Sequence, residues 1–381
     1  MTGSASMQAD DAPVRPIAFY LPQYHRIPEN DRWWGEGFTE WTNVRRAGPL
    51  FPGHAQPKLP GALGYYDLTD PTVLDRQVAL AREYGVRGFC YYFYWFNGHR
   101  LLERPLEAML ARRSPDFPFC VCWANENWTR RWDGGNGEIL ISQQYGFDDS
   151  LRLFDEFLGM FSDPRYIRVG GRPLLLVYRP ALVPDIVATT DLWRERAIAS
   201  GEREPFLVYC ETSGIQQPAD LGFDASLEFP PHGHIAHWLN AQITGLAPAF
   251  EGSVTSYRAL IVQSLERDCS DAKRFRCVVP SWDNTARRGL TGTVFLGSSP
   301  ERFGYWAEAM VRDTRTRLAG DERLMFVNAW NEWAEGCCLE PDTRFGTQYL
   351  EALQRALADG ALAGGDSVEP WRERRAPARQ P

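Results

Sequence analysis

The sequence predicts an α/β protein that folds as a single (β/α)8 TIM-type barrel with long loops after the strands. Three observations support this fold: eight short apolar runs, helical patterns between them, and long connections after the apolar runs but short ones after the helices. Most of the apolar runs are continuous rather than alternating, as expected for parallel strands that are buried on both faces. Eight comparable strand–helix units favour closure into a barrel. The alternative, a doubly wound open sheet, does not require eight such units.

The predicted strands each end in polar or aromatic residues. They are 17–25, 86–96, 117–126, 173–179, 205–212, 223–229, 276–284 and 324–331. Helical patterns cover 71–84, 100–113, 148–161, 185–200, 254–268, 300–319 and 347–358, and the connection before the sixth strand holds only a short turn near 216–221. Residues 166–177, with Gly170 and Gly171 at their centre, indicate a β-hairpin that leads into the fourth strand.

Loop lengths indicate which end of the barrel carries function. The long segments are 26–70, 127–147, 230–253 and 285–299, and each follows a predicted strand. In barrels of this type the loops after the strands build the active site. Because no stretch inside the barrel resembles a linker, we expect one catalytic domain at 15–359, with disordered termini at 1–14 and 360–381.

Composition excludes several classes of protein. Aromatic residues make up 13% of the 381 residues, which fits a ring-lined carbohydrate cleft; the alternative, an aromatic-rich core, would be favoured if the rings fell within the helical patterns, and most do not. A net charge of −8 argues against a nucleic-acid or anionic-membrane surface. Lys58 and Lys273 are the only lysines; neither follows a glycine-rich loop or ends a strand pattern, which excludes a P-loop and disfavours Schiff-base catalysis. We expect no cofactor.

The sequence also suggests a location in the cell. No apolar stretch approaches the roughly 20 residues that span a bilayer, and residues 1–16 lack the layout of a secretory signal. The eight cysteines lie mostly within or beside apolar runs, which suggests buried thiols in a reducing compartment rather than a disulfide framework. We therefore expect a cytoplasmic protein without an integral membrane segment.

An acidic pair directly follows the eighth apolar run. Glu332 and Glu335 lie in Asn-Glu-Trp-Ala-Glu-Gly at 331–336, with Trp330 and Trp333 beside them. Two carboxylates can act as acid and base at a glycosidic bond, and indole rings offer flat apolar faces to a pyranose. For an arbitrary E-x-x-E, two solvated glutamates are the usual interpretation. The strand-end position and the tryptophans favour a sugar-cleaving site.

If the barrel forms, the strand-end side chains converge on one mouth, and their hydroxyls, amides, carboxylates and rings suit an oligosaccharide or polysaccharide. The predicted substrate-binding residues are Tyr20, Tyr24, His25, Trp41, Tyr94, Trp95, Asn125, Glu126, Trp128, Tyr178, Glu211, Asp283, Trp330 and Asn331. Each has a structural alternative: a single strand-end tyrosine is more often structural, and Glu126 or Glu211 can form an ion pair with a barrel arginine.

Two further groups allow two interpretations each. His232, His234 and His237 suggest a metal site, but a histidine loop without strand support more often contacts sugar or is ordinary loop, so we predict no metal. Arg130 and Arg131 either bind a phosphate, as in a nucleotide-sugar donor, or stack on tryptophan to stiffen the loop. The sequence contains no Asp-x-Asp, dinucleotide fingerprint or nucleophile elbow.

Several long motifs resemble the WbsX-type proteins of bacterial surface-polysaccharide loci. They are Tyr-Leu-Pro-Gln-Tyr-His at 20–25 and the segments 33–44, 53–57, 63–68 and 123–129. The resemblance extends from about residue 17 to 355. WbsX-type proteins are often labelled glycosyltransferases, yet their barrel is similar to that of glycoside hydrolase family 99, the endo-α-mannosidase and endo-α-mannanase family.

The family 99 motif Glu-Trp-x-Glu-Gly is matched by residues 332–336. The resemblance implies a retaining mechanism in which Glu332 acts as base on the substrate 2-hydroxyl. That hydroxyl attacks the anomeric carbon and gives a 1,2-anhydro sugar. Glu335 protonates the leaving oxygen and later activates the acceptor. Outside this motif the family's substrate contacts are not matched one by one, so the sugar need not be mannose.

We compare three hypotheses for the function of the protein. The leading hypothesis is a family 99-like retaining enzyme that cleaves or transfers α-linked sugars of O-antigen or a related polysaccharide. The second is a WbsX-type glycosyltransferase of lipopolysaccharide O-antigen biosynthesis; the arginines at 130 and 131 favour it, and the missing Asp-x-Asp disfavours it. The third is a non-catalytic glycan-binding protein, which would not require a paired acid and base.

Overall fold

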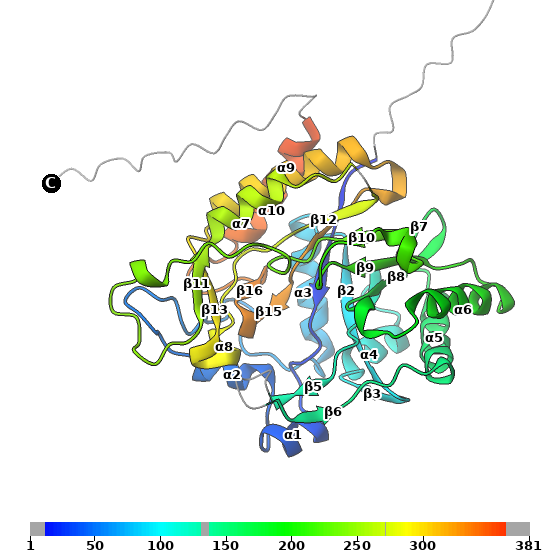
Figure 1. Ribbon diagram of the computed structural model, residues 1–381, viewed down its shortest axis with the longest axis horizontal. Coiled ribbons are helices and arrows are strands. Elements are labelled where there is room, and N and C mark those ends of the chain that lie inside the picture. The colour runs from blue at the N-terminus through cyan, green and yellow to red at the C-terminus, as the bar shows by residue number, and fades with distance from the viewer. Residues whose placement is uncertain (1–11, 131–136, 271, 363–381) are drawn as a thin grey trace, which may run out of the picture.

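The protein forms a closed parallel barrel. The computed structural model describes residues 12–130, 137–270 and 272–362 (Figure 1). The barrel strands are β1 (Arg15–Tyr20), β2 (Gly88–Phe96), β4 (Phe119–Trp123), β8 (Arg172–Val177), β9 (Phe206–Cys210), β10 (Ala225–Leu227), β12 (Arg274–Val278) and β14 (Leu324–Val327). Each is parallel to the next, and β1 pairs with both β2 and β14, which closes the sheet. The predicted (β/α)8 fold is therefore confirmed.

Helices connect the strands and cover the barrel. They are α3 (Pro71–Glu83), α4 (Arg104–Arg112), α5 (Phe147–Phe161), α6 (Ile186–Ala199), α7 (Tyr257–Glu266), α9 (Pro300–Arg317) and α10 (Gln348–Leu362). The local sequence explains where four of these helices begin. Backbone N–H groups in the first turns of α3, α6, α7 and α9 donate to the side chains of the preceding residues, Asp70, Asp185, Ser256 and Ser299. As predicted, only a short 3-10 turn, η3 (Pro218–Leu221), precedes the sixth barrel strand.

Aromatic rings fill part of the barrel interior. The Phe19 ring lies 5.4 Å from Tyr92, 5.0 Å from Phe229 and 5.8 Å from Phe326, measured between ring centroids. All eight cysteines are free and buried. The continuous apolar runs of the sequence therefore correspond to strands that are buried on both sides, as expected for a parallel barrel.

Two predicted boundaries differ from the structure. The helix predicted at 100–113 is preceded by β3 (His99–Leu101), which pairs antiparallel with β2. The helix predicted at 254–268 is preceded by β11 (Ser253–Ser256), which pairs with β13 (Thr293–Leu296). In both cases a distant or adjacent strand partner overrides the local helical pattern. The hairpin before the fourth strand is confirmed by β7 (Arg168–Val169), which pairs antiparallel with β8.

The long loops after the strands carry structure of their own. Residues 26–70 contain α1 (Pro28–Trp34) and α2 (Glu40–Arg46). Figure 1 shows these helices gathered with β5 (Trp128–Thr129), β6 (Ile139–Ile141) and α8 (Thr285–Arg288) at one end of the barrel, the end at which the strands terminate. The same end holds β15 (Asn331–Glu332), η7 (Trp333–Glu335) and β16 (Cys337–Cys338). The remaining 3-10 turns are η2 (Pro180–Leu182), η4 (Asn240–Gln242), η5 (Gly289–Thr291) and η6 (Gly320–Glu322).

The two ends of the chain are described only in part. The predicted disordered segments 1–14 and 360–381 lie largely outside the described residues, although α10 continues past Gly360 to Leu362. No helix among the described residues combines the length and apolar character needed to cross a bilayer.

Candidate active site

The acidic motif forms a tight turn that is fastened to the first strand. β15 and β16 pair antiparallel on either side of η7, which carries Glu335. The Asn331 side chain accepts from the Leu21 backbone N–H at 2.8 Å and donates to the Leu21 carbonyl at 3.0 Å. Tyr24 Oη donates to the Asn331 carbonyl at 2.6 Å and accepts from the Trp333 N–H at 3.1 Å. The segment after β1 therefore sets the orientation of both glutamates.

One arginine joins three carboxylates at this turn. Arg287, on α8 after the seventh barrel strand, donates from Nη1 to Glu335 at 2.7 Å. Its Nη2 donates to Glu332 and to Glu40, each at 3.1 Å. The side chain of Arg287 is 3% exposed, those of Glu40 and Glu332 are 2% and 7% exposed, and that of Glu335 is 21% exposed. Glu335 is thus the member of the cluster most accessible from the cleft.

The electrostatics of this cluster favour retention of a proton. Burial, reinforced by the charge of Glu335 and opposed by Arg287, raises the pKa of Glu332 to about 8. Burial likewise raises the pKa of Glu335, again against the opposing effect of Arg287. Both Glu332 and Glu335 therefore hold a proton more readily than a free glutamate does, although Arg287 opposes the shift in each and Arg288 opposes it in Glu335.

The two glutamates line a cleft of about 710 Å³ at the mouth of the barrel. Aromatic and polar side chains surround it, chiefly Tyr92, Tyr94, Glu126, Trp128, Tyr178, Arg179, His232, Trp282, Asn284, Arg287 and Arg288. Glu126 and Arg179 form an ion pair at 2.7 Å within this wall. Rings with a few fixed polar groups are the usual lining of a small-molecule site, and they suit a sugar.

Six predicted site residues are brought together in the cleft: Tyr94, Glu126, Trp128, Tyr178, Glu332 and Glu335. The sequence interpretation missed Arg287 and Glu40. Glu40 lies in one of the motifs that carry the family resemblance, which is a usable signal. Arg287 had no signal beyond its place in the long segment after the seventh strand, because its partners come from distant parts of the chain.

Several predicted binding residues serve in packing instead. Tyr20 Oη donates to Gln77 of α3, and Trp95 Nε1 donates to Asp149 of α5, so both side chains point to the helical layer. The alternation of side chains along a strand explains this: residues next to mouth-facing ones point outward. Trp330 is fully buried, and its ring lies 5.1 Å from that of Phe89.

Other predicted residues support the acidic turn from behind. Tyr24 and Asn331 hold its backbone, and the Trp41 ring packs between those of Tyr24 and Trp333, at 4.5 and 5.7 Å. His25 is buried within the same segment. For Tyr24, Trp41 and Asn331 we therefore correct the predicted role from sugar contact to positioning, because their polar atoms or rings are already engaged. The correction for His25 is that its side chain is enclosed and does not line the cleft.

The three remaining predicted binding residues form ion pairs, hydrogen-bond a neighbouring backbone or line a second pocket. Glu211 forms buried ion pairs with Arg274, at 2.7 Å, and Arg267, which matches its structural alternative. The Asn125 side chain bonds the Arg179 backbone in both directions, at 2.7 and 2.8 Å. Asp283 accepts from His54 at 2.8 Å and lines a second pocket beside the cleft.

The structure describes the histidine group and one of the two arginines. Among the described residues, no cluster of three or more histidine, cysteine, aspartate or glutamate side chains is arranged to hold a metal. Arg130 donates to Glu138 at 2.7 Å and lies 5.5 Å from the ring centre of Trp34, which agrees with the stacking interpretation. Arg131 lies outside the described residues.

The closed barrel, with an acidic cleft at its mouth, defines the chain as a (β/α)8-barrel protein. The chain belongs to the family described as Glycosyltransferase WbsX, whose model matches residues 16–353. Two curated relatives, each called Uncharacterized protein WxcX, come from two strains of Xanthomonas campestris pv. campestris. Each is 46% identical over 345 residues, which cover 91% of this chain. The chain spans about half the length of these relatives.

Solved structures share the fold at low sequence identity. A glycoside hydrolase-like protein matches with a TM-score of 0.57 and 14% identity, covering 93% of this chain and 97% of its own. The GH99 endo-alpha-mannosidase from Bacteroides thetaiotaomicron matches in two structures with TM-scores of 0.54 and 0.53 and identities of 13% and 14%, covering 93% of this chain and 98% of its own. These likenesses concern the fold alone.

Proposed function

We propose that the chain is a retaining enzyme that cleaves or transfers α-linked sugars of bacterial surface polysaccharide by a 1,2-anhydro-sugar route. The observation that carries the proposal is the single arginine that binds both Glu332 and Glu335 at the wall of an aromatic-lined cleft. A standard retaining pair places nucleophile and acid about 5 Å apart on either side of the sugar. Two glutamates on one turn are better arranged to serve neighbouring carbons of a single ring.

The proposed steps balance protons between the two glutamates. Glu332 takes the proton of the 2-hydroxyl as its oxygen attacks the anomeric carbon. The bond from that carbon to the leaving oxygen breaks, and Glu335 gives that oxygen a proton. Water or an acceptor hydroxyl then loses its proton to Glu335 and opens the 1,2-anhydro ring, while Glu332 returns a proton to the 2-oxygen.

The electrostatics support an acid–base pair at this turn, and the division of roles between the two glutamates follows the family 99 motif. The raised pKa values of Glu332 and Glu335 are what an acid–base pair near neutral pH requires. Glu335 is the more exposed of the two, which suits contact with leaving group and acceptor. We also place the protein in the cytoplasm, with the eight free, buried thiols as the supporting observation.

Mutation of each glutamate tests the proposal. The chain and its Glu332→Gln and Glu335→Gln variants are incubated with surface polysaccharide of the source organism, and products are read by mass spectrometry. Each variant should lose about 10³-fold or more of its activity on poorly activated linkages, because each removes one proton transfer. Glu83→Gln, at an exposed helix position, is the matched control and should stay active.

Two outcomes contradict the mechanism. Full activity of Glu335→Gln would remove its assigned role as acid. Normal turnover of a 2-deoxy analogue would exclude participation of the 2-hydroxyl, because that substrate lacks the attacking oxygen.

The second candidate is a glycosyltransferase that uses a nucleotide-sugar or lipid-linked donor. The family description and the cationic side chains of Arg179 and Arg288 in the cleft favour it. Incubation with nucleotide sugars distinguishes the two candidates. Transfer of sugar with release of a nucleotide supports the glycosyltransferase, whereas cleavage of glycan in the absence of a nucleotide sugar supports the first candidate.

A further inference from the structure

A second pocket adjoins the catalytic cleft behind the acidic turn. It has a volume of about 500 Å³ and is built by the loops after β1, β12 and β14, near residues 53–59, 281–298 and 336–349. Trp282 lines both this pocket and the cleft. Glu335 faces the cleft and the next residue, Gly336, faces the pocket, so one turn forms the wall between them.

The wall of the pocket is held by a fixed positive charge. Lys58 Nζ donates to the Gly336 carbonyl at 3.2 Å and to Ser281 Oγ at 3.4 Å, and it lies 3.8 Å from Asp342. Its side chain is 15% exposed. Because these contacts engage its ammonium, Lys58 contributes charge to the pocket more than it contributes a donor for a ligand.

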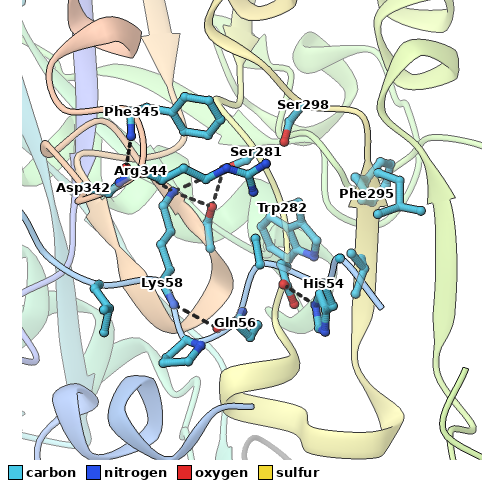
Figure 2. Close-up of a pocket in the computed structure, with 18 of the residues that line it drawn as sticks. His54, Gln56, Lys58, Ser281, Trp282, Phe295, Ser298, Asp342, Arg344 and Phe345 are labelled. Atoms are coloured by element: carbon cyan, nitrogen blue, oxygen red, sulfur yellow. Dashed lines mark hydrogen bonds and ion pairs between the residues drawn. The ribbon is translucent and has the colours of Figure 1, made fainter. Parts of the chain in front are cut away.

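Arg344 supplies the donor that the local structure leaves for a ligand. Its side chain is exposed, and among the described residues no carboxylate lies within 4 Å of it. The guanidinium is 5.0 Å from the ring centre of Phe345. Figure 2 shows Arg344 extending from the side of Asp342 over the pocket toward Ser281 and Trp282. Its planar fork is suited to a carboxylate.

The two carboxylates of the pocket are already bound within the protein. Asp342 accepts from the backbone N–H groups of Arg344 and Phe345, at 2.8 and 2.6 Å. Asp283 accepts from His54 at 2.8 Å and from Thr285 Oγ1 at 2.6 Å. Both carboxylates therefore have partners within the protein, and Lys58 Nζ lies 3.8 Å from the second oxygen of Asp342, whereas Arg344 has no such partner among the described residues.

We propose that this pocket binds a carboxylate-bearing sugar, a hexuronic acid unit, of the same glycan that occupies the cleft. Arg344 binds the carboxylate, the charge of Lys58 adds to the attraction, and the Trp282 and Phe295 rings provide apolar surface for the pyranose. The inference rests on the proposed function, because it names the substrate class as an acidic polysaccharide whose charged residue lies beyond the sugar that reacts.

Binding of simple glycosides tests the pocket without turnover. Methyl glycosides of glucuronic and galacturonic acid are titrated into the full chain by ligand-observed NMR, each beside its neutral hexoside. We expect at least one uronide to bind about five- to tenfold more tightly than its neutral partner. The preference should fall below about twofold in Arg344→Gln, and it should shrink with added salt.

The controls locate the interaction and separate it from catalysis. Arg196→Gln, at an exposed arginine of α6, should keep the preference.

Equal affinity of uronide and hexoside, or a preference that Arg344→Gln leaves intact, overturns the proposal. Inorganic phosphate or uridine diphosphate that binds more tightly than the uronides, and loses that binding in Arg344→Gln, also overturns it and points to a phosphate ligand. Repeating the titration in Glu335→Gln keeps the result independent of turnover, so failure of the catalytic roles and failure of the pocket are read separately.

Discussion

At the residue scale, the properties of the site converge on Arg287. It is the common partner of Glu40, Glu332 and Glu335, and all three ion pairs lie within 3.1 Å. A guanidinium can serve three carboxylates because its donors are arranged in a rigid fork, which a lysine ammonium lacks. We therefore expect Arg287 to position Glu332 and Glu335, the proposed catalytic pair, and to hold their pKa values below what burial alone would produce.

Substitution of Arg287 should separate geometry from charge. Arg287→Lys keeps the charge but loses the fork, so kcat should fall about 100-fold with little movement of the pH optimum. Arg287→Gln also removes the charge, so the acidic limb of the pH–rate profile should move to higher pH. Rates of both variants across pH check this, with Arg196→Lys as the matched control on α6. Unchanged kcat in Arg287→Lys would contradict the positioning role.

Glu332 should make stability depend on pH. Burial raises the pKa of Glu332 from an ordinary 4.5 to about 8, so between these values the folded state binds more protons than the unfolded state. The free energy of unfolding should therefore be highest below pH 4.5 for this group and fall as pH rises through 8. Melting temperatures at pH 5 and pH 9 should differ less in Glu332→Gln than in the parent chain. An unchanged difference would show that Glu332 titrates normally.

At the element scale, the turn that carries the acids depends on Gly336. Its φ is +66°, and a Cβ added there would lie 2.9 Å from the backbone N and O of Asp283. Ser281 Oγ and Lys58 both donate to the Gly336 carbonyl, and the Asp283 N–H donates to the Glu335 carbonyl at 2.8 Å. The loop after β12 therefore fixes the turn from one side and Tyr24 from the other.

Gly336→Ala should damage both stability and activity. The side chain would clash with the Asp283 backbone and strain a left-handed conformation, at a cost of about 1–3 kcal/mol in the free energy of unfolding. Gly64→Ala is a matched control, because Gly64 has a φ of +67° with nothing within 4 Å of its added Cβ. Chemical unfolding of both variants isolates the clash. Equal destabilisation would show that the contact with Asp283 is unimportant.

At the scale of the whole molecule, a buried ion network ties the barrel to its helices. Arg274 and Arg276 of β12 bind Glu211 and Glu228, at 2.7 and 2.8 Å, and Arg276 also binds Asp313 of α9 at 2.7 Å. Removing one partner of a buried pair leaves an uncompensated charge, which is usually more costly than the pair is worth. This network explains why acidic residues at two strand ends are absent from the lining of the cleft.

Glu211→Gln should therefore lower stability rather than weaken ligand binding. We expect a loss of about 3–5 kcal/mol in the free energy of unfolding, because Arg274 and Arg267 lose their buried counter-charge. Urea unfolding measures the loss, and titration with the same glycans measures binding of the folded variant. A variant of normal stability with impaired binding would restore the sugar-contact role first predicted for Glu211.

The sequence by itself determined the barrel and the acidic motif, because both are written in local patterns: continuous apolar strands between helices, and a pair of glutamates directly after the last strand. Tertiary structure alone decided which strand-end side chains face the cleft. Tyr94 lines the cleft whereas Trp95 points to α5, because successive side chains of a strand point to opposite faces of the sheet. It also decided the partners of the acids, since Arg287 and Glu40 are 247 residues apart and meet only when the barrel closes.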